Sequence, residues 1–380
     1  MIYLDNAATS FPKPSEVYEE VLSAMKTYGA NPGRSSHSMG IEASSVIMDT
    51  RSELAELLNV PNPLNIIFTS NATEALNIAI KGVLQKGDHI ISTLLEHNSV
   101  LRPLDSLGKR GMSYSLIGTD GEGHVDLSSL KREIRKNTRA IIINHASNVL
   151  GTLQNLKAVG EIALRHGLTF IVDGSQSVGA IDINVRELNI DLLAFPGHKG
   201  LLGPQGTGGL YIREGLHLET FKEGGTGSSS HSVTQPNFLP DRFESGTLNT
   251  PGIAGLGQGI KFIKKEGLNN IKAKEDSLIN QLIEELSALS YVKLYGPKDT
   301  KNRTSVFSLN LEGFESSQVG QRLNALNIAV RTGYHCAPFV HTIIDTMNRG
   351  TVRISPGYFN TPEDIEALVK GIIGIYSGGI

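Results

Sequence analysis

Short apolar runs rich in β-branched residues alternate with helical patterns through the first half of the chain. This alternation limits the fold more than any other feature of the sequence. Residues 72–84 and 156–166 have helical periodicity between such runs. Strands that alternate with helices build a mostly parallel sheet that is covered on both faces. We therefore predict strands at residues 65–69, 88–93, 138–144, 169–173, 191–195 and 208–212.

The pattern changes after about Gly246. A glycine-rich segment at 250–259 leads into residues 260–265 and a long amphipathic stretch at 271–289. A predicted strand at 304–310 and a closing helix at 361–376 follow. Since 380 residues are enough for two domains, we predict a large α/β domain over residues 13–250 and a smaller α+β domain over 251–380. Residues 1–12 are expected to pack on these domains.

Composition excludes several kinds of partner and site. The net charge is −3 without a basic block, so nothing favours nucleic acid or an anionic membrane. No apolar run approaches the ~18 residues of a membrane span, and no secretory leader is visible at Met1, so we expect a cytoplasmic protein. Cys336 is the only cysteine, which rules out an internal disulfide. The histidine spacing predicts no metal site.

Asp173 and Lys199 each follow a predicted strand, and Lys199 lies in a glycine-flanked turn. The carboxyl ends of parallel strands are where such sheets bind ligands. A buried carboxylate there suits a protonated pyridine nitrogen, and a lysine held near neutrality can attack an aldehyde. Taken alone, Asp173 would be interpreted as an aspartate that caps a turn, and Lys199 as a solvated surface charge. Together they favour a site for pyridoxal 5'-phosphate (PLP).

Residues 68–75 predict an anion site. A strand there runs directly into a helix whose first turn carries the hydroxyl of Thr73 and free backbone N–H groups, which suits a phosphate. Asn71 and Glu74 also fit a capping box, an interpretation compatible with the first. The spacing of a P-loop is absent.

These motifs occur in the order of a known family. The chain resembles the class V aminotransferase family of fold-type I PLP enzymes, and within it the cysteine desulfurase and selenocysteine lyase branch. The resemblance implies a large domain with a mostly parallel seven-stranded sheet, a smaller α+β domain, PLP as cofactor, and a homodimer with a shared active site. It spans essentially the whole chain through residues 3–8, 69–75, 96–98, 147–151, 173–176, 197–199, 243–247, 331–336, 352–355 and 358–361.

The resemblance implies a role for each matching residue. Lys199 would be the Schiff-base lysine and proton shuttle, and Asp173 the partner of the pyridine nitrogen. The remaining cofactor contacts would be His97 stacked over the ring, Gln176 and Asn148 near the ring hydroxyl, and Ala72, Thr73 and His198 at the phosphate, with Thr247 reaching it from a second subunit. Arg353 would hold the substrate carboxylate through its planar fork, with Asn148 and Arg331 nearby.

Cys336 narrows the implied reaction. It occupies the position of the branch's catalytic cysteine, and cations such as Arg331 or His335 would lower the pKa of its thiol. Lys199 would remove the α-proton of L-cysteine and Cys336 would attack the substrate sulfur, leaving L-alanine and a Cys336 persulfide. The short segment between Arg331 and Val352 resembles that of desulfurases that hand the persulfide to an acceptor protein, which predicts a part in iron–sulfur cluster or cofactor synthesis. A buried structural cysteine is the ordinary alternative.

Two departures from the family pattern concern the phosphate and the substrate. Pro196 stands where many members of this branch have a serine that binds the phosphate. Residues 337–349 do not follow the family pattern, and substrate choice could depend on them. His37 and Arg34 are further candidates for lining the pocket. Three alternatives stay open: a selenocysteine lyase, another class V reaction such as transamination or epimerisation in which Cys336 is not catalytic, and a binding protein without catalysis.

Overall fold

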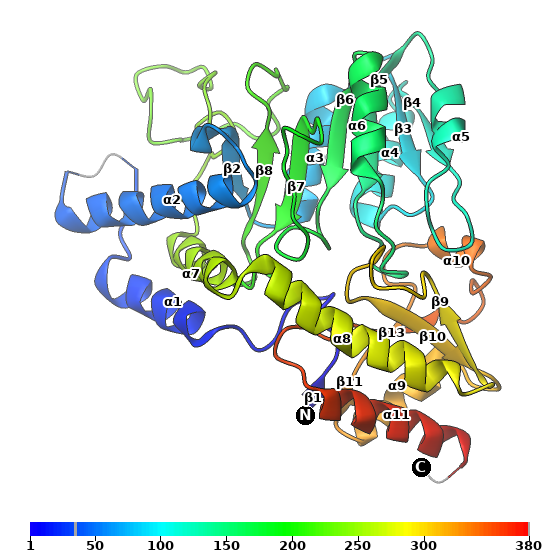
Figure 1. Ribbon diagram of the computed structural model, residues 1–380. Helices are drawn as coiled ribbons and strands as arrows, with labels where there is room; N and C mark the ends of the chain where they lie inside the picture. The colour runs from blue at the N-terminus through cyan, green and yellow to red at the C-terminus, as the bar shows by residue number, and fades with distance from the viewer. Residues whose placement is uncertain (34–35, 379–380) are drawn as a thin grey trace.

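The computed structural model describes residues 1–33 and 36–378, and a seven-stranded sheet forms its centre (Figure 1). The strand order is β2-β8-β7-β6-β5-β3-β4. Only β8 runs against its neighbours, which confirms the predicted, mostly parallel sheet. The strands are β2 (Ile66–Thr69), β3 (His89–Thr93), β4 (Ser113–Ile117), β5 (Thr138–Asn144), β6 (Thr169–Asp173), β7 (Leu192–Pro196) and β8 (Gly208–Ile212).

Both faces of this sheet are buried under helices. Successive residues of β5 show this, because Ile141 packs into the core on one face and Ile142 into the core on the other. Helices α3 (Ala72–Val83) and α4 (Asn98–Gly108) cover one face, and α5 (Leu127–Arg132), α6 (Leu156–Arg165) and part of α2 (Ser38–Leu57) cover the other. Strands buried on both sides are the continuous apolar runs seen in the sequence.

A smaller antiparallel sheet lies beside the large one. Its order is β12-β13-β10-β9. Its strands and helices are β9 (Val292–Tyr295), β10 (Phe307–Leu311), β12 (Arg331–Gly333), β13 (Thr351–Ile354), α9 (Ser316–Ala325), α10 (Val340–Ile343) and α11 (Pro362–Tyr376). Helix α8 (Leu268–Ser287) joins the two parts: Ile271 packs into the core of the large sheet and Leu278 into that of the small one. The division at residue 250 stays a prediction.

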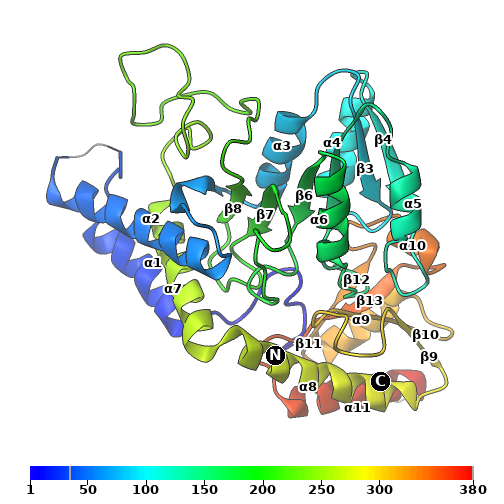
Figure 2. The ribbon, with the colours of Figure 1, turned by 45° about the horizontal axis from the view of Figure 1, so that its top comes forward.

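Glycine allows three helices to pack closely. Helices α1 (Ser15–Thr27), α2 and α7 (Thr250–Glu266) lie side by side in both ribbon views (Figure 2). The glycine-rich segment that opens the C-terminal part of the sequence is the first half of α7. A Cβ atom on Gly255 would overlap Val21 of α1, and one on Gly257 would overlap Thr50 of α2. The missing side chains therefore set the distance between these helices.

The N-terminal segment connects the two sheets. Strand β1 (Ile2–Tyr3) pairs in parallel with β11 (Ile328–Ala329), and Asp5 bridges to Ser355 just beyond β13. The chain then crosses to the large sheet, where the backbone N–H of Ser10 donates to the carbonyl of His198. A short 3-10 helix, η1 (Pro63–Asn65), leads into β2. No helix among residues 1–33 and 36–378 is long and apolar enough to cross a membrane.

Candidate active site

A pocket of about 220 Å³ opens at the carboxyl ends of β5, β6 and β7, the edge at which the sequence predicts a ligand. The first turns of α3 and α4 and the strands β12 and β13 complete its wall. The predicted residues that line it are Ala72, Thr73, His97, Asn148, Asp173, Gln176, His198, Lys199, Arg331 and Arg353. Cys336 and Thr247 lie outside this lining.

Lys199 lies in the turn after β7 and lines the pocket. Within the part of the chain that the structure describes, its Nζ makes no hydrogen bond or ion pair. Burial lowers the pKa of Lys199 to about 8, with Arg353 and Arg331 adding to the effect and Asp173 opposing it. A substantial fraction of this amine is therefore neutral near pH 7 to 8, as a nucleophilic or proton-accepting lysine requires.

Asp173 ends β6 and is 3% exposed. Its Oδ1 accepts hydrogen bonds from the backbone N–H and the hydroxyl of Ser175. Its Oδ2 has no such partner in residues 1–33 and 36–378, and the residue lines the pocket. One carboxylate oxygen is thus left open to accept from a bound cation.

His97 is held by a chain of hydrogen bonds across α4 and α3. The backbone N–H of Ser99 donates to Nδ1 of His97 at 3.1 Å, so Nδ1 is unprotonated and Nε2 carries the proton of the neutral ring. The hydroxyl of Ser99 lies 2.9 Å from the same Nδ1 and 2.8 Å from Oγ1 of Thr73. Burial lowers the pKa of His97, although Asp173 opposes this. The imidazole is therefore neutral at pH 7.

The first turn of α3 combines a cap with open backbone donors. Asn71 accepts from the backbone N–H of Glu74 at 2.9 Å, and Glu74 accepts from the backbone N–H of Ser70 at 2.7 Å. The N–H groups of Ala72 and Thr73 stay at the pocket wall. His198 lines the same pocket and has a buried Nδ1 without a partner among the described residues, and burial lowers the pKa of His198 to about 4. These donors suit a phosphate.

Two arginines face each other on the small sheet. Arg331 and Arg353 are directly opposite on β12 and β13, so their side chains share one face. Arg353 donates to the carbonyl of Asn148 at 3.2 Å and to Oδ1 of Asp5 at 2.6 Å. Like charges opposite each other are unfavourable, so this pair attracts an anion.

The two side-chain amides predicted near the ring hydroxyl, those of Asn148 and Gln176, already donate hydrogen bonds to backbone carbonyls. Asn148 donates to the carbonyl of His335 at 2.7 Å and keeps a buried Oδ1 without a partner among the described residues. Gln176 donates to the carbonyl of Ala7 at 2.9 Å. Pro196, the departure from the family pattern, lines the pocket beside them.

Cys336 lies on an exposed loop next to the pocket. Its carbonyl accepts from the backbone N–H of Asn98 at 2.8 Å, which brings the loop to the residue after His97. Both His335 and Cys336 have positive φ angles, 52° and 60°. Burial lowers the pKa of His335 well below its usual value. The imidazole is neutral at pH 7, so the expectation that it supplies a cation to the thiol is wrong.

Thr247 and His37 lie elsewhere. Thr247 belongs to a segment held by Glu244, which forms a buried ion pair with Arg51 at 2.8 Å. Its predicted role depends on a second subunit. His37 caps α2 by accepting from the backbone N–H of Gly40 and does not line the Lys199 pocket. Arg34 lies outside the described residues.

Sequence reasoning missed several residues of the pocket. Ser99 carries the hydroxyl that joins His97 to Thr73, and Ser175 holds Asp173. Asn144 also lines the wall, and Asp5 pairs with Arg353. Ser99 lies two residues after His97 and Ser175 two residues after Asp173. This proximity to predicted site residues was the only signal for them in the sequence. Nothing local marked Asp5 as a partner of Arg353.

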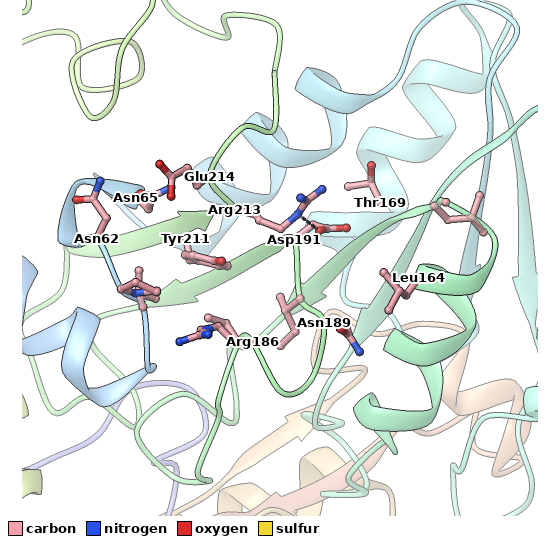
Figure 3. Close-up of a pocket in the computed structure, with 16 residues that line it drawn as sticks. Asn62, Asn65, Leu164, Thr169, Arg186, Asn189, Asp191, Tyr211, Arg213 and Glu214 are labelled. Atoms are coloured by element: carbon pink, nitrogen blue, oxygen red, sulfur yellow. Dashed lines mark hydrogen bonds and ion pairs between the residues drawn. The ribbon is translucent and has the colours of Figure 1, made fainter.

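A second pocket lies at the opposite edge of the large sheet (Figure 3). It is lined by Thr169 at the start of β6, Asp191 before β7 and Arg213 after β8. Arg213 pairs with Asp191, which also accepts from the backbone N–H of Phe170. None of the predicted site residues lines this pocket. Among residues 1–33 and 36–378, no group of three His, Cys, Asp or Glu side chains is arranged to hold a metal ion.

Comparison with known proteins gives one consistent family. The family model for aminotransferase class-V matches residues 2–368. A probable cysteine desulfurase of Methanothermobacter thermautotrophicus is 34% identical, covering 97% of this chain and 92% of its own. A cysteine desulfurase of Escherichia coli O157:H7 is 32% identical over 99% of this chain and 93% of its own.

Solved structures agree with this result. The apo cysteine desulfurase of Thermococcus onnurineus NA1 superposes with a TM-score of 0.93 at 35% identity, covering 100% of this chain and 95% of that one. The S-sulfonic acid form of an Escherichia coli cysteine desulfurase gives 0.89 at 26% identity, over 99% of this chain and 94% of that one.

Proposed function

We propose that this chain, which belongs to the aminotransferase class-V family, is a PLP-dependent cysteine desulfurase that converts L-cysteine to L-alanine. The observation that carries the proposal is the meeting of Lys199, Asp173 and Arg353 in one pocket. They come from the two sheets and supply an amine, an open carboxylate oxygen and a cation for a substrate carboxylate. Relatives and structural neighbours named cysteine desulfurases support the same activity.

The pocket residues fit PLP. Asp173 has an oxygen available for a pyridinium nitrogen, and Lys199 has an unpaired amine for the aldehyde. The backbone N–H groups of Ala72 and Thr73 and the unpartnered Nδ1 of His198 would hold the phosphate. Asn148 has an open Oδ1 for the ring hydroxyl. When bound, PLP supplies an electron sink for the α-carbon of an amino acid.

The chain's own residues would orient the substrate and move its proton. Arg353 and Arg331 attract the carboxylate, which sets the α-carbon relative to Lys199. Neutral Lys199 accepts the α-proton and later returns a proton to the product. Neutral His97, fixed by Ser99, forms a flat wall that does not compete with the arginines for the substrate's negative charge.

Cys336 would take the sulfur. Its thiolate attacks the substrate sulfur, so an S–S bond forms while the substrate C–S bond breaks. The electron pair of that bond stays with the substrate carbon, which is protonated to give L-alanine. The sulfur remains as a Cys336 persulfide, and the exposure of Cys336 supports its transfer to an acceptor protein, as iron–sulfur cluster assembly requires.

We also propose a homodimer. Helix α1 exposes Tyr18, Leu22 and Met25, which lie on one face at helical spacing, and α2 exposes Ile41 and Met48. A second copy of this chain that covers these helices would bury the apolar patch. It would also give Thr247 a route to the partner's phosphate.

The decisive experiment incubates the PLP-loaded protein with L-cysteine and measures alanine and the mass of the peptide that bears Cys336. We expect alanine to form and this peptide to gain one sulfur atom. In Cys336→Ala, alanine formation should fall by about 100-fold or more, because the nucleophile is lost. Unchanged alanine formation in this variant would mean that Cys336 is not catalytic and would favour another class V reaction. L-selenocysteine assayed alongside distinguishes a selenocysteine lyase.

Lys199→Ala provides the matching test of the cofactor. We expect the visible absorbance band of bound PLP to disappear, because the covalent link needs the lysine amine. Asp105→Asn is a suitable control, since it removes a carboxylate from an exposed ion pair with Lys109. A retained covalent band in Lys199→Ala would show that another amine holds PLP.

A further inference from the structure

Arg353 is a buried cation beside other cations. It is 1% exposed, stands opposite Arg331, and lines the same pocket as Lys199. Taking a guanidinium out of water is costly unless it is paired and hydrogen-bonded. Burial lowers the pKa of Arg353, Arg331 adds to this, and Asp5 opposes it. The arrangement therefore needs a negative charge close to Arg353.

Asp5 provides that charge. Its Oδ1 accepts from Nη2 of Arg353 at 2.6 Å, and Nη1 donates to the carbonyl of Asn148 at 3.2 Å. A guanidinium has five N–H donors, and these two bonds use only two of them. Nε in particular has no partner among the described residues. Asp5 and Asn148 thus hold the guanidinium and leave donors for a further carboxylate.

The backbone around Asp5 is fixed on both sides. The N–H of Leu4 donates to the carbonyl of Ala329 at 2.9 Å, and the N–H of Asn6 donates to the carbonyl of Ser355 at 3.1 Å. The N–H of Ser355 returns a bond to Leu4 at 2.7 Å. Asp5 is therefore fixed beside Ser355, which lies two residues beyond Arg353 in the sequence.

The same segment also contacts the turn of Lys199. The hydroxyl of Ser10 donates to the carbonyl of Lys199 at 3.0 Å, and the carbonyl of Ala7 accepts from Gln176. Residues 5–10 thus link the arginine of the small sheet to the lysine of the large one. We therefore expect a change at Asp5 to alter the position of the Arg353 guanidinium.

We propose that Asp5 is a positioning residue for substrate binding: it holds Arg353 where the free N–H groups of its guanidinium can bind the substrate carboxylate. The inference rests on the proposed role of Arg353 as the carboxylate clamp. Asp5 acts only through Arg353 and does not touch the reacting atoms.

The test uses the PLP-loaded homogeneous enzyme and the variant Asp5→Asn, which keeps the shape of the side chain and removes its charge. We expect KM for L-cysteine to rise by about tenfold or more while kcat changes by less than about threefold, because ground-state orientation of the carboxylate is lost. Asp105→Asn, which breaks an exposed ion pair, should leave both constants unchanged.

Binding measured without turnover gives the sharper readout. L-alanine and ethylamine differ only by the carboxylate, and both can be titrated against the visible absorbance of the bound cofactor. In Asp5→Asn, the affinity for L-alanine should fall by about tenfold, and that for ethylamine should stay as in the unmodified enzyme. Equal weakening of both ligands would indicate a general structural defect and overturn the proposal. Tighter binding of L-alanine would mean that Asp5 competes with the substrate, which also overturns it.

Arg353→Gln separates this inference from the proposed function. If this variant binds L-alanine as well as the unmodified protein does, Arg353 does not bind the substrate carboxylate. If it weakens L-alanine binding while Asp5→Asn does not, only the role of Asp5 is wrong. In the double variant, Asp5→Asn should add nothing to the loss caused by Arg353→Gln. Asp5→Glu keeps the charge but moves it by one methylene, so its affinity for L-alanine should lie between that of Asp5→Asn and that of the unmodified enzyme. This variant serves as the test if Asp5→Asn does not fold.

Discussion

At the scale of single residues, burial decides which groups carry charge around the pocket. It lowers the pKa of His198 and of His145 to about 4, so both imidazoles are neutral at pH 7. It raises the pKa of Glu96 to about 8, with Asp173 adding to the effect. Arg331 and Arg353 therefore face a substrate as cations together with Lys199, whose amine is mostly protonated at pH 7 and loses its charge as the pH rises through about 8.

The burial of Glu96 predicts that the stability of the fold depends on pH. It is fully buried, and its Oε1 accepts from the hydroxyl of Thr93 at 2.7 Å and the backbone N–H of Asn144 at 3.0 Å. Its pKa is higher in the folded than in the unfolded state, so the folded protein binds the extra proton. The resulting stability is present below the unfolded pKa and is lost as the pH rises toward about 8.

Glu96→Gln should abolish this loss, because glutamine resembles the protonated acid and does not titrate. Urea unfolding of the apo protein at pH 5.5 and pH 8 measures the difference. Between these two pH values, we expect the free energy of unfolding to fall on the order of 2 kcal/mol further in the unmodified protein than in Glu96→Gln. Glu366→Gln, at an exposed ion pair with Lys370, is the control. An identical pH dependence in both proteins would show that Glu96 is ionised in the folded state.

At the scale of elements, helix α7 forms although its composition disfavours a helix. Helix α7 is rich in glycine, which lowers helix propensity. It persists because Gly255 and Gly257 let it pack directly on α1 and α2. Tertiary packing therefore outweighs local preference, and α7 in turn supports the core face behind β7 through Leu256 and Ile260.

Gly257→Ala tests this packing. The added methyl group would collide with Thr50, so we expect the free energy of unfolding to fall by about 1–3 kcal/mol despite the better helix propensity of alanine. Gly108→Ala near the end of α4 is the matched control, because its Cβ would make only ordinary contact with Tyr114. Thermal or urea unfolding compares the two. Equal stabilisation in both variants would mean that the helices can separate without cost.

At the scale of the whole molecule, the site exists only where two sheets meet. The large sheet contributes Asp173 and Lys199, the small sheet contributes Arg353, and residues 5–10 connect them. Helix α1, which carries the exposed residues Tyr18, Leu22 and Met25, lies beside α2 and away from the small sheet (Figure 1).

Leu22→Asp tests the proposed dimer. The leucine is 52% exposed in the single chain, and a charge at its position would be buried without a partner in a dimer. We expect sedimentation velocity to show a shift from dimer toward monomer, together with weaker PLP retention if Thr247 serves the partner's site. Asp105→Asn should leave the sedimentation unchanged. A dimer that persists unaltered in Leu22→Asp would exclude this face as the interface.

The sequence by itself determined the class of fold and most of the pocket. Alternation of apolar runs predicted six of the seven large-sheet strands within one or two residues, because a strand buried on both faces must be apolar throughout. It missed β4, whose burial is only partial, and α1 and α2, whose exposed apolar residues blur the helical pattern. Motif order identified the family, and with it most of the residues that line the pocket.

Only the tertiary structure decided which polar groups meet and which of them are charged. Asp5 and Arg353 are 348 positions apart, and no periodicity links them. The low pKa of Lys199 and the neutral ring of His335 arise from desolvation by segments distant in the sequence. Local sequence patterns record which side of an element is buried. Contacts between remote side chains, and the loss of water around them, depend on how all the elements pack together.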